Sequence, residues 1–323
     1  MSKRFDVIGI ESPCLDFPLN MNSLPKSNGG ARLNNYSWQG GGKVSTGMIA
    51  AARLGAKCCQ IGAVGDDIFG MACYKDFVRH GVDVSHMYIR EGKTTPLSVV
   101  MSDLETMGRS IVFAAGNCGR VSDDEIPEDL LRDSKYYFTA FLSDQSLRAA
   151  KIAKEAGAEV LIDADGYSET TIQNMGLIDY FIASEFFYKK LWQDTDYEAH
   201  CREMKALGPK VAMFTLGEKG CVGIDENDEF FQYPAYNVPV VDTVGCGDVY
   251  HGAFLAGLLQ GWGGKRVAQF ASAVSAIKAT RIGGRAGIPN METVLKFMET
   301  GEIDPTELDQ RELEYRRGLE LKV

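Results

Sequence analysis

The feature that most restricts the fold is a regular alternation of short apolar runs with helix-like segments. After residue 133 the strand-like runs "SKYYFTAF", "EVLIDAD", "YFIAS" and "KVAMFTLG" follow one another, with helical patterns such as "SLRAAKIAKEAG" between them. Strands that alternate with helices form parallel sheets whose two faces are covered by the helices. The sequence therefore predicts a doubly wound α/β fold, in which ligands bind beyond the carboxyl ends of the strands.

Two segments interrupt this alternation. The first is rich in Asn, Pro, Gly and Ser, and the second contains the strand-like runs "TTPLSVVMSD" and "RSIVFAAG" joined by a polar turn. Together they predict a small β-sheet that stands off the main domain as a lid. The predicted organisation is an α/β domain (residues 1–10, 37–88 and 117–303), a β lid (11–36 and 89–116) and a C-terminal surface helix (304–323).

The C-terminal segment "DPTELDQRELEYRRGLELKV" carries the signals of a helix start. Asp304 is the expected N-cap, Pro305 the first helical residue and Glu307 the third. Its high charge favours a helix with a solvated face, and packing on a partner subunit is the alternative.

Composition excludes several classes of function. The net charge of −10 disfavours binding to nucleic acid, and no apolar run is long enough to span a membrane. We expect no secretory signal, because the first residues contain no long apolar run followed by a small-residue cleavage site. The eight cysteines are scattered without a C-x-x-C pair, and there are only four histidines. We therefore expect reduced thiols in a cytoplasmic protein rather than disulfides or a zinc site.

The stretch "VVDTVGCGDVYHGAFLAGLLQG" combines a glycine turn with the start of an apolar helix. The amides of Gly245, Cys246 and Gly247 would point at the helix N-terminus, which favours an anion. Asp248 follows at once, although a carboxylate beside an anion is electrostatically costly. It either caps the helix or acts as a base that accepts a proton during phosphoryl transfer.

Four ordered motifs make the chain resemble the ribokinase-like (PfkB) family of carbohydrate and nucleoside kinases. The glycine turn is similar to the family's Asp-Thr-x-Gly-Ala-Gly-Asp signature, and "GGKVSTGMIAAARLG" with "GAVGDDIFG" is similar to its amino-terminal signature. "TLGEKG" resembles the nucleotide-side loop, and "ATRIGGRAGIP" the closing segment. The resemblance covers about residues 5 to 300. It implies an ATP-dependent carbohydrate kinase with a β lid that closes over the substrate.

The resemblance also implies roles in the glycine turn. Asp248 would be the catalytic base, and the amides of residues 245–247 would stabilise the transferring phosphoryl group. Asp242 and the Val244 carbonyl match positions that bind a monovalent cation such as K⁺ in some members. An orienting hydrogen bond within the turn is the alternative for Asp242.

On the acceptor side, the resemblance assigns Asp16 to the hydroxyl groups of the substrate, because a carboxylate accepts two hydrogen bonds from a diol. Gly41 and Gly42 would let the substrate approach the backbone. Lys43 matches a lysine of ribokinase-like members. The family usually carries Asn where this chain has Thr46, which leaves the usual pentose or hexose specificity open.

On the nucleotide side, the resemblance implies ATP with Mg²⁺. The family's Asn-x-x-Glu motif falls where the chain has Ser184 and Phe187, and Glu185 is the nearby acidic residue that could act on Mg²⁺ indirectly. Residues 273–280 are expected to line the adenine slot. Phosphate and ribose contacts are assigned to Thr215, Gly217 and Gly220.

Cys246 stands where the family usually has a smaller residue. A thiol at a helix N-terminus can have a lowered pKa and be reactive, and a small filler is the alternative.

Three alternatives for function and assembly also remain at this stage. A nucleoside kinase would need a base-stacking aromatic such as Tyr36, Trp38 or Phe113, and a non-catalytic binding protein would not need Asp248. Paired lid sheets could form a homodimer.

Overall fold

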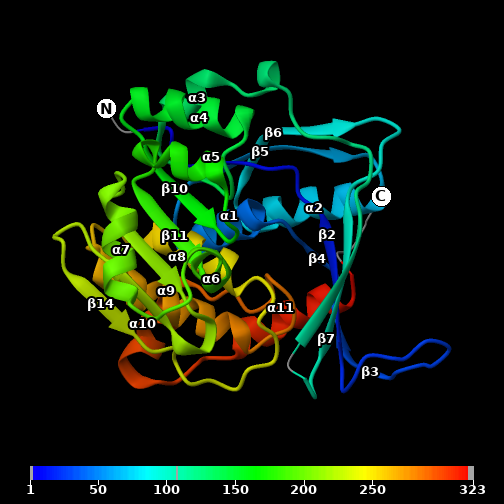
Figure 1. The fold of residues 1–323 in the computed structure, drawn as a ribbon. Helices are drawn as coiled ribbons and strands as arrows, with labels where there is room; N and C mark the ends of the chain where they lie inside the picture. Colours follow the sequence, from blue (N-terminus) through cyan, green and yellow to red (C-terminus); the bar gives the residue numbers. More distant parts are fainter. Residues whose placement is uncertain (1–2, 107, 319–323) are drawn as a thin grey trace.

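The computed structural model describes residues 3–106 and 108–318. Its main sheet has nine strands in the order β14-β13-β12-β11-β10-β9-β1-β5-β6, and all neighbours are parallel except β12–β13 and β13–β14 (Figure 1). This confirms the predicted α/β fold. The strands are β1 (Phe5–Ile10), β5 (Cys58–Gly65), β6 (Asp83–Arg90), β9 (Ser134–Thr139), β10 (Glu159–Ala164), β11 (Tyr180–Ser184), β12 (Val211–Thr215), β13 (Cys221–Ile224) and β14 (Phe230–Tyr233).

Helices cover both faces of this sheet. Side chains of α1, α8 and α9 pack on one face, and those of α3, α4 and α7 pack on the other. No described helix is long and apolar enough to cross a membrane. The α-helices are α1 (Lys43–Arg53), α2 (Ile68–Arg79), α3 (Glu128–Arg132), α4 (Asp144–Glu155), α5 (Glu169–Gln173), α6 (Glu185–Leu191), α7 (Tyr197–Ala206), α8 (Cys246–Leu259), α9 (Gly264–Ala279), α10 (Met291–Thr300) and α11 (Thr306–Arg316), and the 3₁₀ helices are η1 (Asp123–Glu125), η2 (Met175–Leu177) and η3 (Gly217–Lys219).

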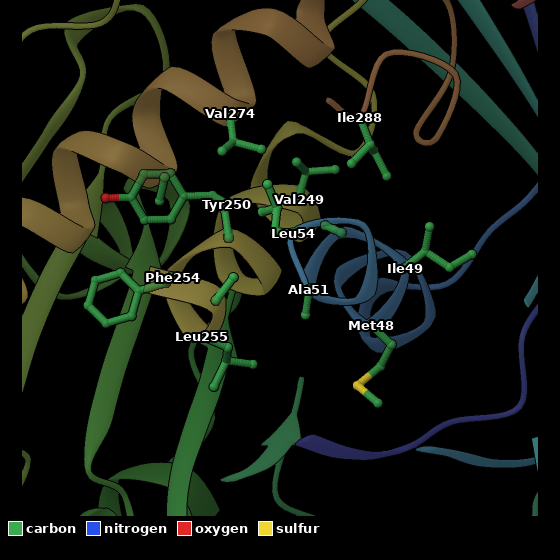
Figure 2. Close-up of a cluster of buried hydrophobic side chains, with 14 of the residues drawn as sticks. Met48, Ile49, Ala51, Leu54, Val249, Tyr250, Phe254, Leu255, Val274 and Ile288 are labelled. Atoms are coloured by element: carbon green, nitrogen blue, oxygen red, sulfur yellow. The ribbon is translucent and has the colours of Figure 1, made fainter. Parts of the chain in front are cut away.

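The helices α1 and α8 cross at very short range. A Cβ atom built on Gly252 would lie 2.0 Å from the carbonyl oxygen of Gly47, so the crossing needs glycine. Met48 of α1 and Phe254 of α8 are both buried and belong to the same hydrophobic cluster (Figure 2). The close crossing fixes the beginning of α8 relative to the beginning of α1, where the predicted catalytic and substrate residues lie.

A second sheet forms the lid, as predicted (Figure 1). Its strands β2 and β7 pair in parallel, and β8 lies at an edge with every residue exposed. The short strand β4 also pairs with β2, although the sequence placed it in the α/β domain. The lid strands are β2 (Leu15–Met21), β3 (Leu33–Tyr36), β4 (Gln39–Gly40), β7 (Leu97–Asp103) and β8 (Gly108–Ala114).

The C-terminal helix α11 packs more closely than a charged surface helix would. Leu308, Arg311 and Tyr315 are buried, and the Arg311 Nε donates to the Ala286 carbonyl at 3.0 Å. Charged side chains on the other positions obscured this buried stripe in the sequence. The predicted segment extends to residues 319–323, which lie outside the described residues.

Candidate active site

The turn before α8 is held by the carboxylate of Asp242. Its Oδ1 accepts a hydrogen bond from the Val244 amide at 3.0 Å, and its Oδ2 accepts one from the Gly283 amide at 2.9 Å. The side chain is buried. Both carboxylate oxygens therefore orient backbone amides. This matches the orienting hydrogen bond that was considered for Asp242 as the alternative to cation binding.

Gly245 connects this turn to the helix. Its φ of 76° lies in the left-handed region, and a Cβ there would be 2.7 Å from the Cα of Gly284. Its carbonyl accepts the first helical hydrogen bond, from the Val249 amide at 2.9 Å. Glycine is therefore required both by the backbone angle and by the closing segment packed against it.

Two of the three backbone amides predicted to bind an anion are available for a ligand. Within the described residues, the amides of Gly245 and Gly247 have no protein acceptor. The Cys246 amide, predicted to share this role, instead donates to the Thr243 carbonyl at 3.2 Å. Apart from its chain neighbours and the backbone of its own helix, no atom lies within 4 Å of a Cβ built on Gly247, so the space at this position is open. The helix N-terminus thus offers an open anion site.

Asp248 lies beside this site among other charged groups. Burial raises its pKa well above the ordinary value, and the carboxylate of Asp163 raises it further. Glu11 and Asp16 act in the same direction, whereas the ammonium of Lys43 opposes them. Asp248 is therefore a more basic carboxylate than an aspartate in water, as a proton acceptor near neutral pH should be.

Lys43 begins α1 and faces the end of β10. Its Nζ forms an ion pair with Asp165 at 2.7 Å, and about half of each side chain is exposed. Burial opposes the charge on Lys43, but Asp163 and Asp165 together raise its pKa. Lys43 therefore remains a cation near Asp248.

Asp16 extends from lid strand β2 toward the glycine loop. A Cβ on Gly41 would lie 2.3 Å from the Asp16 carboxyl carbon, so the two are in direct contact. The Gly41 amide donates to the Cys14 carbonyl at 2.7 Å, and the Cys14 thiol contacts Asp16 Oδ1 at 3.3 Å. Burial raises the pKa of Asp16. The structure thus brings the lid carboxylate to the loop predicted to bind the substrate.

Glu11 is an acidic residue of the site that the sequence did not reveal. Its Oε2 accepts a hydrogen bond from the Ser45 amide at 2.8 Å, at the beginning of α1. A Cβ on Gly42, whose φ is 99°, would lie 2.5 Å from the same oxygen. Burial raises the pKa of Glu11. Glu11 therefore holds the beginning of α1 and packs against Gly42 of the glycine loop.

Thr46 has a hydrogen-bond partner that the sequence did not predict. Its Oγ1 accepts a hydrogen bond from the Nε of the fully buried Arg285 at 3.4 Å. Arg285 also donates to the Gly41 carbonyl at 3.0 Å and to Asp76 at 2.7 Å. Thr46 therefore contacts a guanidinium that supports the loop.

Ser184 and Glu185, at the position of the family's magnesium motif, are engaged by protein groups. Ser184 Oγ caps α6 by accepting from the Phe186 amide at 3.1 Å, and it donates to the Asp165 carbonyl at 2.6 Å. Glu185 forms an ion pair with Lys189. Across the described residues, no group of three or more His, Cys, Asp or Glu side chains is arranged to hold a metal ion.

The nucleotide-side loop follows β12. Thr215 donates from its hydroxyl to the Ala183 carbonyl at 3.4 Å. Gly217 has a φ of 59°, and a Cβ there would lie 3.8 Å from Glu185, which places the loop near that carboxylate. At Gly220 a Cβ would lie 1.9 Å from the Tyr233 carbonyl. Packing against β14 therefore explains Gly220 without a ligand.

Cys246 is not an acidic thiol. Burial raises its pKa, and this outweighs the lowering effect of the nearby Lys278 ammonium. Its Sγ contacts the Ser275 carbonyl at 3.7 Å. The raised pKa contradicts the hypothesis of a thiol activated by a lowered pKa, although Cys246 itself is partly exposed.

Comparison with solved structures identifies the fold. The chain is similar to the solved structures of ribokinase from Thermotoga maritima (TM-score 0.77, 22% identity, 92% of this chain and 100% of that one) and of a putative ribokinase II from E. coli in complex with ATP and Mg²⁺ (0.80, 23%, 93% and 99%). Both similarities define a ribokinase-like fold.

Comparison with sequence relatives and with a family model identifies the protein family. The chain is 26% identical over 280 residues to ribokinase of Haemophilus influenzae (82% of this chain, 89% of that protein) and 25% identical over 324 residues to 5-dehydro-2-deoxygluconokinase of Clostridium perfringens (92% and 94%). The model of the pfkB family carbohydrate kinases matches residues 10–291. The chain therefore belongs to the PfkB family of carbohydrate kinases, which are phosphotransferases with an alcohol group as acceptor.

Proposed function

We propose that this kinase transfers the γ-phosphoryl group of ATP to a primary hydroxyl of a sugar or sugar-like substrate. The observation that carries the proposal is the position of Asp248, a carboxylate of raised pKa, next to the open amides of Gly245 and Gly247. The amides suit the phosphoryl oxygens, and the carboxylate suits the proton of the attacking hydroxyl.

The reaction needs one proton transfer and one displacement. Asp248 accepts the proton of the substrate CH₂OH as its oxygen attacks the γ-phosphorus, and the bond to the β-phosphate oxygen breaks to release ADP. The turn amides, together with the positive end of the α8 dipole, stabilise the negative charge on the transferring group. General-base catalysis by Asp248 contributes about 10²–10⁴-fold to the rate.

The substrate is proposed to lie between the lid and the glycine loop. Asp16 accepts hydrogen bonds from two hydroxyls, and Gly41 and Gly42 leave room for the sugar beside their backbone. Lys43 and Thr46 are proposed to complete this side of the site. The direct contact of Asp16 with Gly41 supports a shared substrate-binding surface.

ATP is proposed to lie on the opposite side, along the loop that contains Thr215 and Gly217. Gly220 has its own packing role there. Mg²⁺ would be bound to ATP and would neutralise phosphate charge there. Ser184 and Glu185 already have protein partners, so we propose at most an indirect contact of Glu185 with the ion through water.

A nucleoside kinase is the second candidate. The Trp38 ring stacks on Phe17 with centroids 4.1 Å apart, so one of its faces is covered, whereas Tyr36 and Phe113 are exposed. A non-catalytic binding role is disfavoured because a binder of phosphate gains nothing from the carboxylate of Asp248 beside the anion site.

The assembly and location of the enzyme are also proposals. The exposed edge strand β8 carries Ile111, Val112 and Phe113 with more than half of each side chain exposed, which supports a homodimer through the lid. The eight cysteines are all unpaired, which supports a reducing cytoplasm.

ADP release from Mg-ATP, measured across sugars, sugar phosphates, polyols and nucleosides, tests the function. Asp248→Asn should abolish release with the class that the wild type uses. Asp144→Asn, which also alters the first turn of a helix, is the matched control and should leave the rate unchanged. Release that survives Asp248→Asn would refute the mechanism, and release only with nucleosides would favour the second candidate.

A further inference from the structure

Lys278 is a fully buried lysine in the last turn of α9. Its Nζ donates to the Asp242 carbonyl at 2.9 Å and also to the Val244 carbonyl. The thiol of Cys246 lies 3.9 Å away. All three partners belong to the turn that carries the open amides, and all are neutral groups.

The Val244 carbonyl is one of the two groups that the family resemblance assigned to a monovalent cation, and the other, Asp242, has both carboxylate oxygens bound to amides. Carbonyl oxygens bind K⁺ and an ammonium group by the same ion–dipole attraction. Since the Lys278 ammonium already occupies this carbonyl, the turn does not fit an added K⁺ ion.

We propose that Lys278 is a positioning residue that replaces the monovalent cation, so that this kinase works without K⁺. The proposal rests on the proposed function, because it assigns the turn to phosphoryl transfer. The lysine is covalently attached, and the turn is therefore held in one arrangement at any salt composition.

Peptide geometry explains how Lys278 would act on the site. The C=O and N–H of a trans peptide point in opposite directions. When Lys278 holds the Val244 carbonyl, it turns the Gly245 amide away from itself, and this amide has no acceptor among the described residues. The ammonium also adds positive charge behind the anion site.

The cost of the buried charge supports a functional role. A desolvated ammonium is unfavourable unless its surroundings compensate for lost hydration. The two carbonyls and the C-terminal end of the α9 dipole supply part of this compensation. The nearby phosphates of a bound nucleotide would supply more, whereas an apolar side chain would fill the same space at lower cost in the free protein.

The first test needs no mutation. Wild-type activity is measured in a buffer with tetramethylammonium as the only monovalent cation, and tetramethylammonium is then replaced by K⁺ at an unchanged ionic strength of about 0.1 M, so that charge screening stays constant. We expect the rate to change by less than about twofold, the scale of general ionic-strength effects. A severalfold activation by K⁺ would overturn the proposal.

Two substitutions separate a missing charge from a missing side chain. Lys278→Ala opens a space beside the carbonyls, and Lys278→Met fills it without charge. Both should lower kcat by about 10²-fold, the scale for losing an oxyanion donor, with little change in KM for the sugar. Added K⁺ or NH₄⁺ should restore Lys278→Ala by tenfold or more, on the order of what one such donor contributes, and should not restore Lys278→Met.

Thermal unfolding provides a readout independent of any substrate. K⁺ should raise the unfolding temperature of Lys278→Ala more than Na⁺ does, because only a folded site binds it. The wild type and Lys154→Ala, which removes a lysine paired with Asp179 elsewhere, should show no such preference. If Lys278→Ala responds to K⁺ in neither assay, the lysine only ties α9 to the turn and the proposal fails. A K⁺ response in unfolding without sugar kinase activity would instead count against the proposed function alone.

Discussion

The guanidinium of Arg285 and the carboxylate of Asp76 form an ion pair of 2.7 Å in which neither side chain has exposed surface. The pair is extended on both sides. Arg285 donates to the Gly41 carbonyl, and Tyr315 of the C-terminal helix donates to the other carboxylate oxygen at 2.6 Å. A chain of polar contacts therefore runs from α11 through α2 to the loop proposed to bind the sugar.

Asp76→Asn should destabilise the protein strongly. Removing one partner leaves a buried guanidinium uncompensated, which costs about 3–5 kcal/mol. Urea unfolding monitored by circular dichroism measures the change. Glu198→Gln breaks the exposed pair with Arg202 and should cost less than about 1 kcal/mol. Equal losses for the two variants would show that the buried pair has no special role.

Gly41→Ala should weaken sugar binding selectively. The new methyl group would lie 2.3 Å from the carboxylate of Asp16 and displace it. We expect KM for the sugar to rise by about tenfold, the scale of one lost hydrogen bond to a charged group, while KM for ATP stays the same. Gly30→Ala, where no atom lies within 4 Å, is the control. An unchanged sugar KM in Gly41→Ala would remove Asp16 from the substrate site.

Gly247→Ala should separate stability from catalysis. Nothing in the protein contacts a Cβ at this position, and alanine favours a helix over glycine by up to about 1 kcal/mol. The unfolding temperature should therefore be unchanged or higher, whereas activity should fall because the methyl group enters the anion site. Gly245→Ala should lose both, since its φ and the contact with Gly284 forbid a side chain. Full activity in Gly247→Ala would place the phosphate elsewhere.

The pH dependence of kcat/KM should reveal the raised pKa of Asp248. A base works when deprotonated, so activity falls as the pH decreases through that pKa, at a higher pH than for an ordinary aspartate. Lys43→Met should move this acidic limb to still higher pH, because the ammonium opposes the shift. Lys43→Arg keeps the charge and should leave the limb in place. A limb that is insensitive to Lys43→Met would assign the titration to another group.

Asp248→Asn should stabilise the protein at neutral pH. A carboxylate whose pKa is raised by folding binds protons more tightly when folded, so its contribution to stability decreases as the pH rises through its ordinary and raised values. Asparagine removes this penalty, and calorimetry should show a higher unfolding temperature at pH 8 but a smaller gain at pH 4. A lower unfolding temperature at both values would mean that the charge of Asp248 stabilises the fold.

The sequence predicted those structural features that are local in the chain. Residue types at short spacing predicted the glycine turn and the helix that starts next to it, and the strand–helix alternation predicted the sheet. The turn amides were predicted as a set of three, but Cys246 uses its amide to close the turn. A backbone hydrogen bond of this kind depends on angles that residue types do not reveal.

Contacts between distant segments could not be predicted in the same way. Arg285 and Asp76 are separated by 209 residues, and Lys278 lies 34 residues after the Val244 carbonyl that it contacts. In the sequence, Lys278 is an ordinary basic residue near a helix C-terminus. Only the packing of α9 against the turn makes it a buried cation.

The polar chain from Tyr315 to Gly41 has a consequence for biosynthesis. Tyr315 contacts Asp76 across 239 residues of sequence. At about 5–20 residues per second, the ribosome adds α11 on the order of tens of seconds after it has made the loop proposed to bind the sugar. For most of that interval Arg285 has not been made either, so Asp76 lacks both of these partners. A nascent chain would therefore complete the polar support of this loop only at the very end of its synthesis.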